Sequence, residues 1–211
     1  MKTKLFITFF IIATIANAQY IKLFDFTDDS ESGGLPFGSL ITDGAFLYGM
    51  TQTGGTDDSG TVFKIKKDGT GYSTLLNFSD LTMGGSPMGS LFSDGGFLYG
   101  TTTVGTSNHP GGIFKIKPDG SGYSNVHDFL GNPDGESPRG SLVSDGTFLY
   151  GMTATGGTST ACSTPLTGCG TIFKIKPDGT GYSKLLDFSG SNGSEPLGDL
   201  IYDGTFLYGM T

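Results

Sequence analysis

The chain is built from one sequence unit that returns about every fifty residues. The string Asp-Gly-x-Phe-Leu-Tyr-Gly begins at four aspartates that are 51, 51 and 58 residues apart: Asp43, Asp94, Asp145 and Asp203. The string Phe-Lys-Ile-Lys begins at Phe63, Phe114 and Phe173. A third motif, Pro-x-Gly-Ser-Leu, begins at Pro36, Pro87 and Pro138, with Pro196-Leu-Gly-Asp-Leu as its fourth copy. A period near fifty predicts a repeat architecture, and propeller blades have about this length.

Each repeat has the pattern of four short strands. In the third copy we expect them at 141–144, 148–153, 171–176 and 182–188, with a tight turn at Asp145-Gly146 between the first two. Four strands per repeat predict an all-β fold, a β-propeller of about four-stranded blades with a repeat of about 51 residues. An open-ended β-solenoid is the alternative.

The repeats divide the chain into two parts. Residues 1–18 form a targeting segment, and residues 19–211 form the propeller domain. Tyr20–Phe26 matches the fourth strand of a blade. Complete blades are expected at about 38–78, 89–129 and 140–188, and a partial blade at 198–211. Because the last copy stops after two strands, we expect an incomplete ring from a C-terminally truncated chain.

Composition supports strands joined by turns. The 211 residues include 37 glycines, while 36% of the residues are hydrophobic and 12% aromatic. Glycine costs about 1 kcal/mol at each helical position, so this glycine content disfavours a mainly helical protein. The apolar content is sufficient for a packed core.

The first eighteen residues resemble a secretory signal peptide. Lys2 and Lys4 precede an apolar run at 5–16, and Ala16-Asn17-Ala18 has the small-x-small pattern of a cleavage site. Twelve apolar residues are too few to span a bilayer, which needs about twenty. We expect cleavage after Ala18, a secreted or cell-surface protein, and no transmembrane segment in the mature chain.

The charge of the chain excludes one class of partner. The formal net charge is −8, and removal of Lys2 and Lys4 makes it more negative. Such a chain repels phosphate backbones and anionic lipid, so nucleic acid is not an expected partner.

The repeat motifs also resemble a known family. Asp-Gly-x-Phe-Leu-Tyr-Gly-Met-Thr, Gly-Thr-Ile-Phe-Lys-Ile and Lys-Pro-Asp-Gly-Thr-Gly-Tyr are similar to the bacterial GloVer tandem repeat, over about Tyr20 to Thr211. Proteins with this repeat are secreted and carry one of several alternative C-terminal anchoring signals. The resemblance implies an extracellular or surface-exposed protein, and it implies no catalytic residues.

Residues present in every copy are expected to maintain the blade. The aspartates of the Asp-Gly-x-Phe motif, and the set Asp68, Asp119 and Asp178, are predicted to form turns. The motif aromatics are predicted to pack between blades: Phe46, Phe97, Phe148 and Phe206 with Tyr48, Tyr99, Tyr150 and Tyr208.

The segments that differ between copies are the connections from the second to the third strand and from the fourth strand to the next first strand. In an up-and-down blade both kinds lie at one end, so we expect a variable, acidic loop face that binds protein or glycan. Its candidate residues are Asp57, Asp58, His109, Asp134, Glu136, Arg139 and Glu195.

Metal and cofactor signals are weak. Asp28, Asp29 and Glu31 form the densest acidic group and are the candidates for Ca²⁺, which prefers oxygen ligands. No segment has the spacing of an EF-hand loop, and no other cofactor is predicted. Solvated surface acids explain the same residues.

The catalytic inventory is small. Of the two histidines, His109 lies in a variable loop, and His127 takes a fourth-strand position held by Phe or Leu elsewhere, which favours a structural role. These residues favour a non-catalytic binding or scaffold module over an enzyme. Two alternatives stay open: a carbohydrate-active or other hydrolase or lyase using loop carboxylates, and a structural surface-array protein without a specific ligand.

Cys162 and Cys169 lie in the one long insertion of a chain that we expect to be secreted. They are predicted to form a disulfide that closes a local loop.

Overall fold

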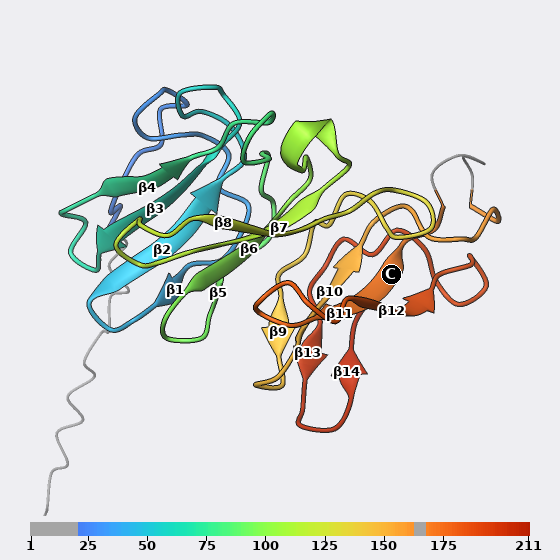
Figure 1. The fold of residues 1–211 in the computed structure, drawn as a ribbon. Helices are drawn as coiled ribbons and strands as arrows, with labels where there is room; N and C mark the ends of the chain where they lie inside the picture. Colours follow the sequence, from blue (N-terminus) through green and yellow to red (C-terminus); the bar gives the residue numbers. More distant parts are fainter. Residues whose placement is uncertain (1–20, 163–167) are drawn as a thin grey trace, which may run out of the picture.

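A computed structural model describes residues 21–162 and 168–211 of the chain. These residues form three four-stranded sheets followed by a two-stranded half-sheet, which succeed one another from blue to red in Figure 1. The first sheet contains β1 (Ile41–Thr42), β2 (Phe46–Thr51), β3 (Thr61–Lys66) and β4 (Ser73–Asn77). The second contains β5 (Phe92–Ser93), β6 (Leu98–Thr102), β7 (Gly112–Ile116) and β8 (Ser124–Asp128).

The third sheet contains β9 (Val143–Ser144), β10 (Leu149–Thr153), β11 (Thr171–Ile175) and β12 (Ser183–Asp187). The half-sheet consists of β13 (Ile201–Tyr202) and β14 (Leu207–Tyr208). One 3₁₀ turn, η1 (Thr106–Asn108), lies between β6 and β7.

All strand pairs are antiparallel and join strands that follow one another within one repeat. This is the order of an up-and-down propeller blade, and the prediction of four-stranded blades is confirmed. Among the described strands no pairing runs from one repeat to the next, as a solenoid of stacked strands would require.

The turns between first and second strands are built by the motif aspartates. Oδ1 of Asp94 accepts hydrogen bonds from the amides of Gly96 and Phe97, at 2.8 and 2.7 Å. Gly95 has a φ of +90°, a conformation that side chains disfavour. The other three copies repeat these bonds, so the predicted turn role of the set is confirmed. Asp68, Asp119 and Asp178 close the turns between third and fourth strands in a similar way.

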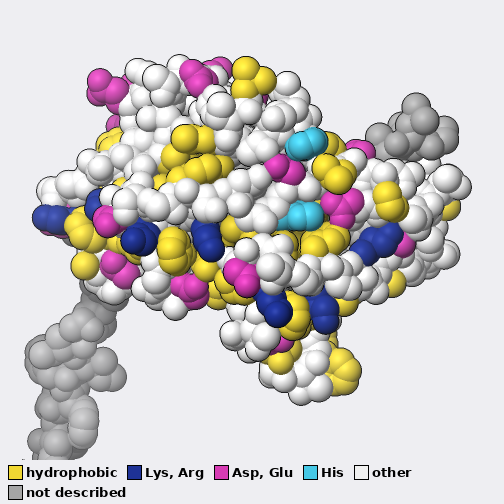
Figure 2. Space-filling model, in the orientation of Figure 1, with side chains coloured by type: hydrophobic (Ala, Val, Ile, Leu, Met, Phe, Trp, Pro, Cys, Tyr) yellow, Lys and Arg dark blue, Asp and Glu magenta, His cyan; other side chains and the backbone are white. Residues whose placement is uncertain are grey.

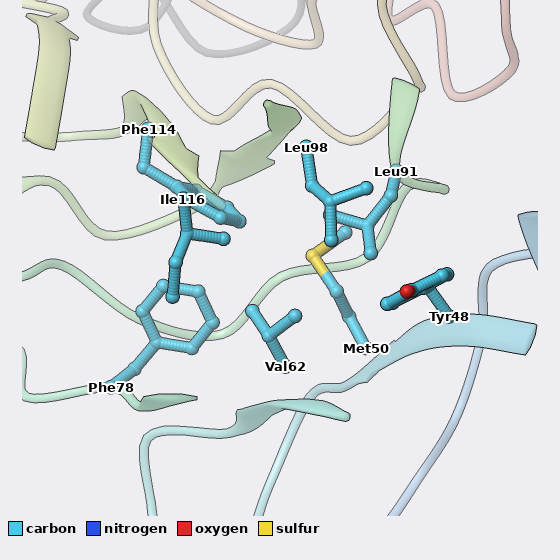
Figure 3. Packing of buried hydrophobic residues seen from close by; sticks show 8 residues of the cluster. All are labelled: Tyr48, Met50, Val62, Phe78, Leu91, Leu98, Phe114 and Ile116. Carbon is cyan, nitrogen blue, oxygen red and sulfur yellow. The ribbon is translucent and has the colours of Figure 1, made fainter. Parts of the chain in front are cut away.

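The core lies between successive blades. Figure 3 shows Met50 and Val62 from the first blade facing Leu98, Phe114 and Ile116 from the second. All five side chains are buried. Each joint therefore requires apolar positions from two repeats, which explains why one repeat cannot bury its core by itself.

The motif aromatics divide into two groups. Tyr48 and Tyr99 are buried in the joints, as predicted. In the three complete blades the phenylalanines are only partly buried, and a lysine of the adjacent third strand covers each ring: Lys64 over Phe46, Lys115 over Phe97 and Lys174 over Phe148, at 5.0, 5.2 and 4.6 Å. Part of the packing at these phenylalanines is therefore cation–π contact within a blade. In the half-sheet Phe206 and Tyr208 are exposed, so the predicted packing between blades is wrong for these two residues.

The segment before the first blade packs as a fourth strand would. Phe24 stacks on Tyr72 at 4.0 Å, and Phe26 meets Phe63 edge-on at 5.1 Å. The fourth strand of the second blade makes the same two contacts with the third blade. The strand expected at Tyr20–Phe26 is not formed over the described residues 21–26, although Phe24 and Phe26 make these fourth-strand contacts.

The predicted signal peptide, residues 1–18, lies outside the described residues. In the described part of the chain no helix is long and apolar enough to cross a membrane.

Candidate binding face

The variable connections meet at one rim of the blades. We call this rim the variable-loop face; it comprises the described parts of 27–35, 52–60, 79–86, 103–112, 130–137, 154–170 and 189–195. The loop entering the second blade pairs with the next loop through Gly85 and Val104. The same loop bonds the preceding blade, because the Ser86 amide donates to the Ser59 carbonyl at 2.8 Å. Equivalent bonds recur at the other joints, so backbone contacts fasten each loop to both neighbours.

Several acids predicted for this face shape its loops. Asp58 accepts the Gly54 amide at 2.8 Å, and Glu136 accepts the Thr155 hydroxyl at 3.3 Å. Asp57 and Glu195 are exposed. The predicted residues thus share one rim, and part of their carboxylate capacity is used internally.

The calcium candidates organise the first loop. Asp29 accepts bonds from the Thr27 hydroxyl and from the Ser32 amide and hydroxyl, which hold its pKa well below the ordinary value. Asp28 accepts the Thr53 hydroxyl at 2.6 Å. Over residues 21–162 and 168–211, no three metal-ligating side chains gather where an ion could be held. Calcium binding by Asp28, Asp29 and Glu31 therefore stays a prediction without a geometric site.

His127 occupies a contact between the second and third blades. Its ring stacks on Tyr182 at 4.3 Å, and its Nε2 lies 3.2 Å from Oδ2 of Asp134. Burial raises the pKa of the Asp134 carboxyl, but the interactions with His127, Tyr182 and the Leu130 amide together outweigh it, and the pKa lies below its ordinary value. These contacts agree with the structural role expected for His127.

His109 lies near a second aspartate that sequence reasoning did not identify. Its Nδ1 is 3.7 Å from Oδ2 of Asp128, whose Oδ1 accepts the Thr106 amide at 2.8 Å. Asp187 holds Thr158 in the same way one repeat later. The sequence signal that could have identified these aspartates is a polar residue at the end of the fourth strand in each copy; the first repeat has Asn77 at this position.

The Pro-x-Gly-Ser segments form a ladder along the inner edge of the blades. The Ser39 amide donates to the Ser90 hydroxyl at 2.8 Å, and the Ser90 amide donates to the Ser141 hydroxyl at 2.7 Å. The Ser141 amide donates to Oδ1 of Asp199 at 2.6 Å. A Cβ on Gly140 would stand 2.1 Å from the Gly198 carbonyl oxygen, so glycine is needed for this approach.

A shallow cavity of about 230 Å³ opens on this ladder. The residues at the variable x position of the motif line it: Phe37, Met88, Arg139 and Leu197. We call this the axial cavity. Arg139 is exposed and is the only one of the four that carries a charge. Sequence reasoning identified Arg139 but not its three apolar partners, whose signal was one variable position inside an otherwise constant motif.

The lysines lie mostly away from the loops, and Figure 2 shows the Lys and Arg side chains of the visible face below the upper, loop-bearing part. One exception is Lys184, which donates to the Pro133 carbonyl at 2.9 Å and pairs with Asp187 at 2.8 Å. Lys184 is therefore a second cation near the variable loops, in addition to Arg139.

A larger cavity of about 480 Å³ lies at the opposite rim, between the turns of the first two blades. Asp43 and Tyr48 line it, and they bond each other at 2.7 Å. Asp43, Tyr48 and Gly95 of this lining recur in every repeat, and Asp43 already closes a turn, so the axial cavity is the better candidate site.

The predicted disulfide is present between Cys162 and Cys169. It closes the insertion between β10 and β11 at the variable-loop face. The five residues 163–167 inside the closed loop lie outside the described residues.

Comparison with known proteins gives a family and a fold. A family model described as the Gloeobacter/Verrucomicrobia repeat matches residues 8–165. A search of the curated proteins finds no match.

Among solved structures, a chain of a nidogen/laminin complex matches 82% of this chain and 54% of its own length, with 19% identity and a TM-score of 0.53. This likeness supports the propeller-like fold. Two further matches each have a TM-score of 0.46. A putative TolB from Agrobacterium tumefaciens is 14% identical, and the match covers 74% of this chain and 49% of that one. TolB from Acinetobacter baumannii is 12% identical, and the match covers 80% of this chain and 39% of that one. The chain spans about half the length of these three solved structures, or less.

Proposed function

The chain belongs to the Gloeobacter/Verrucomicrobia repeat family, and we propose that it is a secreted or cell-surface propeller that acts as a non-catalytic binding or scaffold module. Its ligand, a protein or a glycan, binds the variable-loop face at and around the axial cavity.

One observation carries this proposal: the positions that vary between repeats lie where the axial cavity opens. The loops that differ between repeats share one rim, and the variable x positions of the inner motif line a cavity on the ladder. The opposite rim consists of nearly identical turns. A rigid scaffold that presents differing loops is a common arrangement for binding.

The composition of the axial cavity indicates the ligand chemistry. Three apolar side chains line the cavity together with the exposed Arg139, so the cavity suits a group with an apolar surface and a negative charge or hydrogen-bond acceptors. The chain of similar fold in the nidogen/laminin complex supports a protein as partner, by analogy only.

The disulfide supports an extracellular location, because such bonds persist in oxidising compartments. The signal-peptide pattern at 1–18 also supports secretion.

Binding of the purified chain to immobilised neutral, acidic and amino polysaccharides and to purified extracellular proteins tests the proposal. We expect saturable binding to one class of these probes. Arg139→Ala should weaken it at least tenfold, as truncation of a central interface arginine commonly does. Lys117→Ala is the matched control, since it also removes an exposed cation but lies on the turn rim.

Three outcomes would contradict the proposal. Equal losses in the two variants would mean that binding is non-specific charge attraction. Turnover of a polysaccharide that Glu136→Gln abolishes would favour the hydrolase or lyase. Absence of binding across the panel would favour a structural array protein without a ligand.

A further inference from the structure

Two residues at the axial cavity depart from the pattern of the repeats. The x position of the Pro-x-Gly-Ser motif is apolar in three of the four copies, and it is Arg139 in the third copy. The last position of the motif is a serine in three copies, and it is Asp199 in the fourth. Both exceptions line the same cavity. One cation and one anion thus meet at a site where the corresponding residues of the other copies carry no charge.

The two charged side chains do not pair with each other. Within the described part of the chain, the Arg139 guanidinium forms no ion pair and no hydrogen bond. Asp199 accepts the Ser141 amide through Oδ1 at 2.6 Å, and its Oδ2 has no hydrogen-bond partner among the described residues. Both residues are exposed. They therefore leave a strong donor and a strong acceptor for a ligand that contacts both.

The serines of the ladder add hydrogen-bonding capacity to the same cavity. The hydroxyls of Ser90 and Ser141 each accept one amide, and neither donates a bond to another described residue. Because a hydroxyl can donate one bond and accept two, their protons are available to a ligand. Phe37 and Met88 line the cavity beside them. The site thus combines several free polar groups with an apolar wall.

Charge narrows the class of ligand. Arg139 and Asp199 are the charged residues of the lining, so its formal charge is zero, while the whole chain carries −8. A polyanion is repelled by such a chain. A cationic group that reaches Asp199 meets Arg139 in the same cavity. A neutral ligand that both donates and accepts hydrogen bonds meets neither obstacle.

We propose that the axial cavity binds a hexose unit of a neutral polysaccharide. This inference rests on the proposed binding function and selects a glycan as the ligand. One sugar hydroxyl accepts a bond from Arg139, and a neighbouring hydroxyl donates to Oδ2 of Asp199. The apolar face of the sugar ring lies against Phe37, whose side chain is 59% exposed. The shallow cavity suits one unit of a long chain, because a free small molecule is usually enclosed by its site.

Isothermal titration calorimetry with neutral oligosaccharides of glucose, mannose or galactose tests the proposal. One of these probes should bind saturably to the purified chain. Binding should persist when the salt concentration is raised to about 1 M, where the Debye length is about 3 Å and charge attraction between exposed groups is screened. Uronate and glucosamine oligosaccharides of equal length should bind more weakly than the neutral probe.

Two conservative substitutions test the hydrogen bonds. Arg139→Lys keeps the charge but loses the planar fork of donors. Asp199→Asn keeps an oxygen for the Ser141 amide but removes the second acceptor. Each should weaken binding at least about tenfold, the effect of losing one hydrogen bond to a charged group. Because one sugar contacts both residues, the double variant should lose less than the product of the two single losses.

Lys117→Arg is the matched control, since it exchanges one exposed cation for another on the turn rim. It should bind the sugar as the unmodified chain does. Urea denaturation should show that all the variants are folded, so that a loss of binding reports on the site.

The outcomes separate this inference from the function on which it rests. If a protein or a charged polysaccharide binds through Arg139 and no neutral oligosaccharide binds, the neutral sugar is wrong and the binding module stands. Sugar binding that neither Arg139→Lys nor Asp199→Asn weakens would overturn the assignment to the axial cavity. Absence of binding to every probe would overturn both the inference and the proposed function.

Discussion

The hydroxyl of Tyr99 donates a 2.8 Å hydrogen bond to Oδ2 of Asp94, five residues earlier, while Oδ1 of the same carboxylate closes the turn between β5 and β6. One aspartate thus connects the turn to the joint between blades, where Tyr99 is buried. The bond recurs in the other three repeats. The four tyrosines differ in burial, from 2% exposed at Tyr99 to 53% at Tyr208.

This difference predicts unequal effects of the same substitution. Tyr99→Phe should lower the free energy of unfolding by about 1.5–3 kcal/mol, the range for a hydrogen bond to a charged group. Tyr208→Phe should have a clearly smaller effect, because water replaces the lost bond at an exposed site. Urea denaturation of both variants measures the difference. Equal effects would show that the bond acts on the turn only.

The same aspartates predict how stability depends on acid. The Phe46 amide and the Tyr48 hydroxyl lower the pKa of Asp43 below its model-peptide value of 3.8. At Asp94 burial raises the pKa, but bonds from Phe97, Gly96 and Tyr99 outweigh it, and the pKa is again lowered. The folded state then binds fewer protons than the unfolded state, so stability is full above the unfolded pKa and decreases as the pH falls through and below about 4.

Thermal unfolding midpoints measured from pH 7 down to pH 2 test this. Asp94→Asn should flatten the decrease, since one of the titrating groups is removed. A midpoint that rises on acidification would contradict the assignment.

Tyrosine titration predicts a second loss of stability in alkali. Burial and the bond to Asp43 raise the pKa of Tyr48 to about 12. The folded state keeps a proton that the unfolded state loses near pH 10, so stability should fall as the pH rises from about 10 toward 12. The unfolding midpoint should therefore be highest between these two ranges, and Tyr48→Phe should reduce the alkaline loss.

The sequence was most informative where repeats agree. Asp94 and its equivalents were recognised as turn residues because Asp-Gly between short apolar runs has a local physical meaning. Strand order followed from the same logic, and β9 to β12 lie within or close to the ranges expected for the third copy.

The axial cavity was harder to predict from the sequence, because its residues are distant in sequence. Phe37, Met88, Arg139 and Leu197 line one cavity only after the backbones of successive repeats approach closely at Gly38, Gly89 and Gly140. No local pattern encodes that contact. Asp128 was missed for a related reason, since its partner Thr106 lies 22 residues away.

Two successive joints between blades have different side chains at equivalent positions, a polar pair in one and an apolar pair in the other. His127 and Asp134 form a polar pair between the second and third blades. At the equivalent positions one joint earlier the chain has Leu76 and Met83. The backbone setting is shared, because the carbonyls of Met83 and Asp134 both accept a tyrosine hydroxyl.

A double-mutant cycle should therefore show strong coupling. His127→Leu leaves the largely buried carboxylate of Asp134 without its imidazole partner and should cost about 1–3 kcal/mol. The double variant His127→Leu/Asp134→Met reproduces the apolar pair and should recover most of that loss. Urea denaturation measures all four proteins. Additive losses would mean that the two side chains act independently.

The ladder on the inner edge predicts a sharp requirement at Gly140. A Cβ there would meet the Gly198 carbonyl oxygen at 2.1 Å, a backbone atom that cannot rotate away. Gly140→Ala should force the two segments apart, weaken the bond from the Ser141 amide to Asp199, and lower the free energy of unfolding by about 1–3 kcal/mol.

Gly96→Ala is the matched control for this prediction, because a Cβ there would meet only Oδ1 of Asp94, at an ordinary contact distance of 3.5 Å, and its φ is not positive. It should be neutral or slightly stabilising, by up to about 1 kcal/mol, since alanine restricts the unfolded chain. Moving the ladder segments apart also widens the axial cavity, so Gly140→Ala should weaken the binding of any ligand whose binding Arg139→Ala weakens. Gly140→Ala with unchanged stability would show that the blades adjust freely at their inner edge, and a rigid axial site would then be excluded.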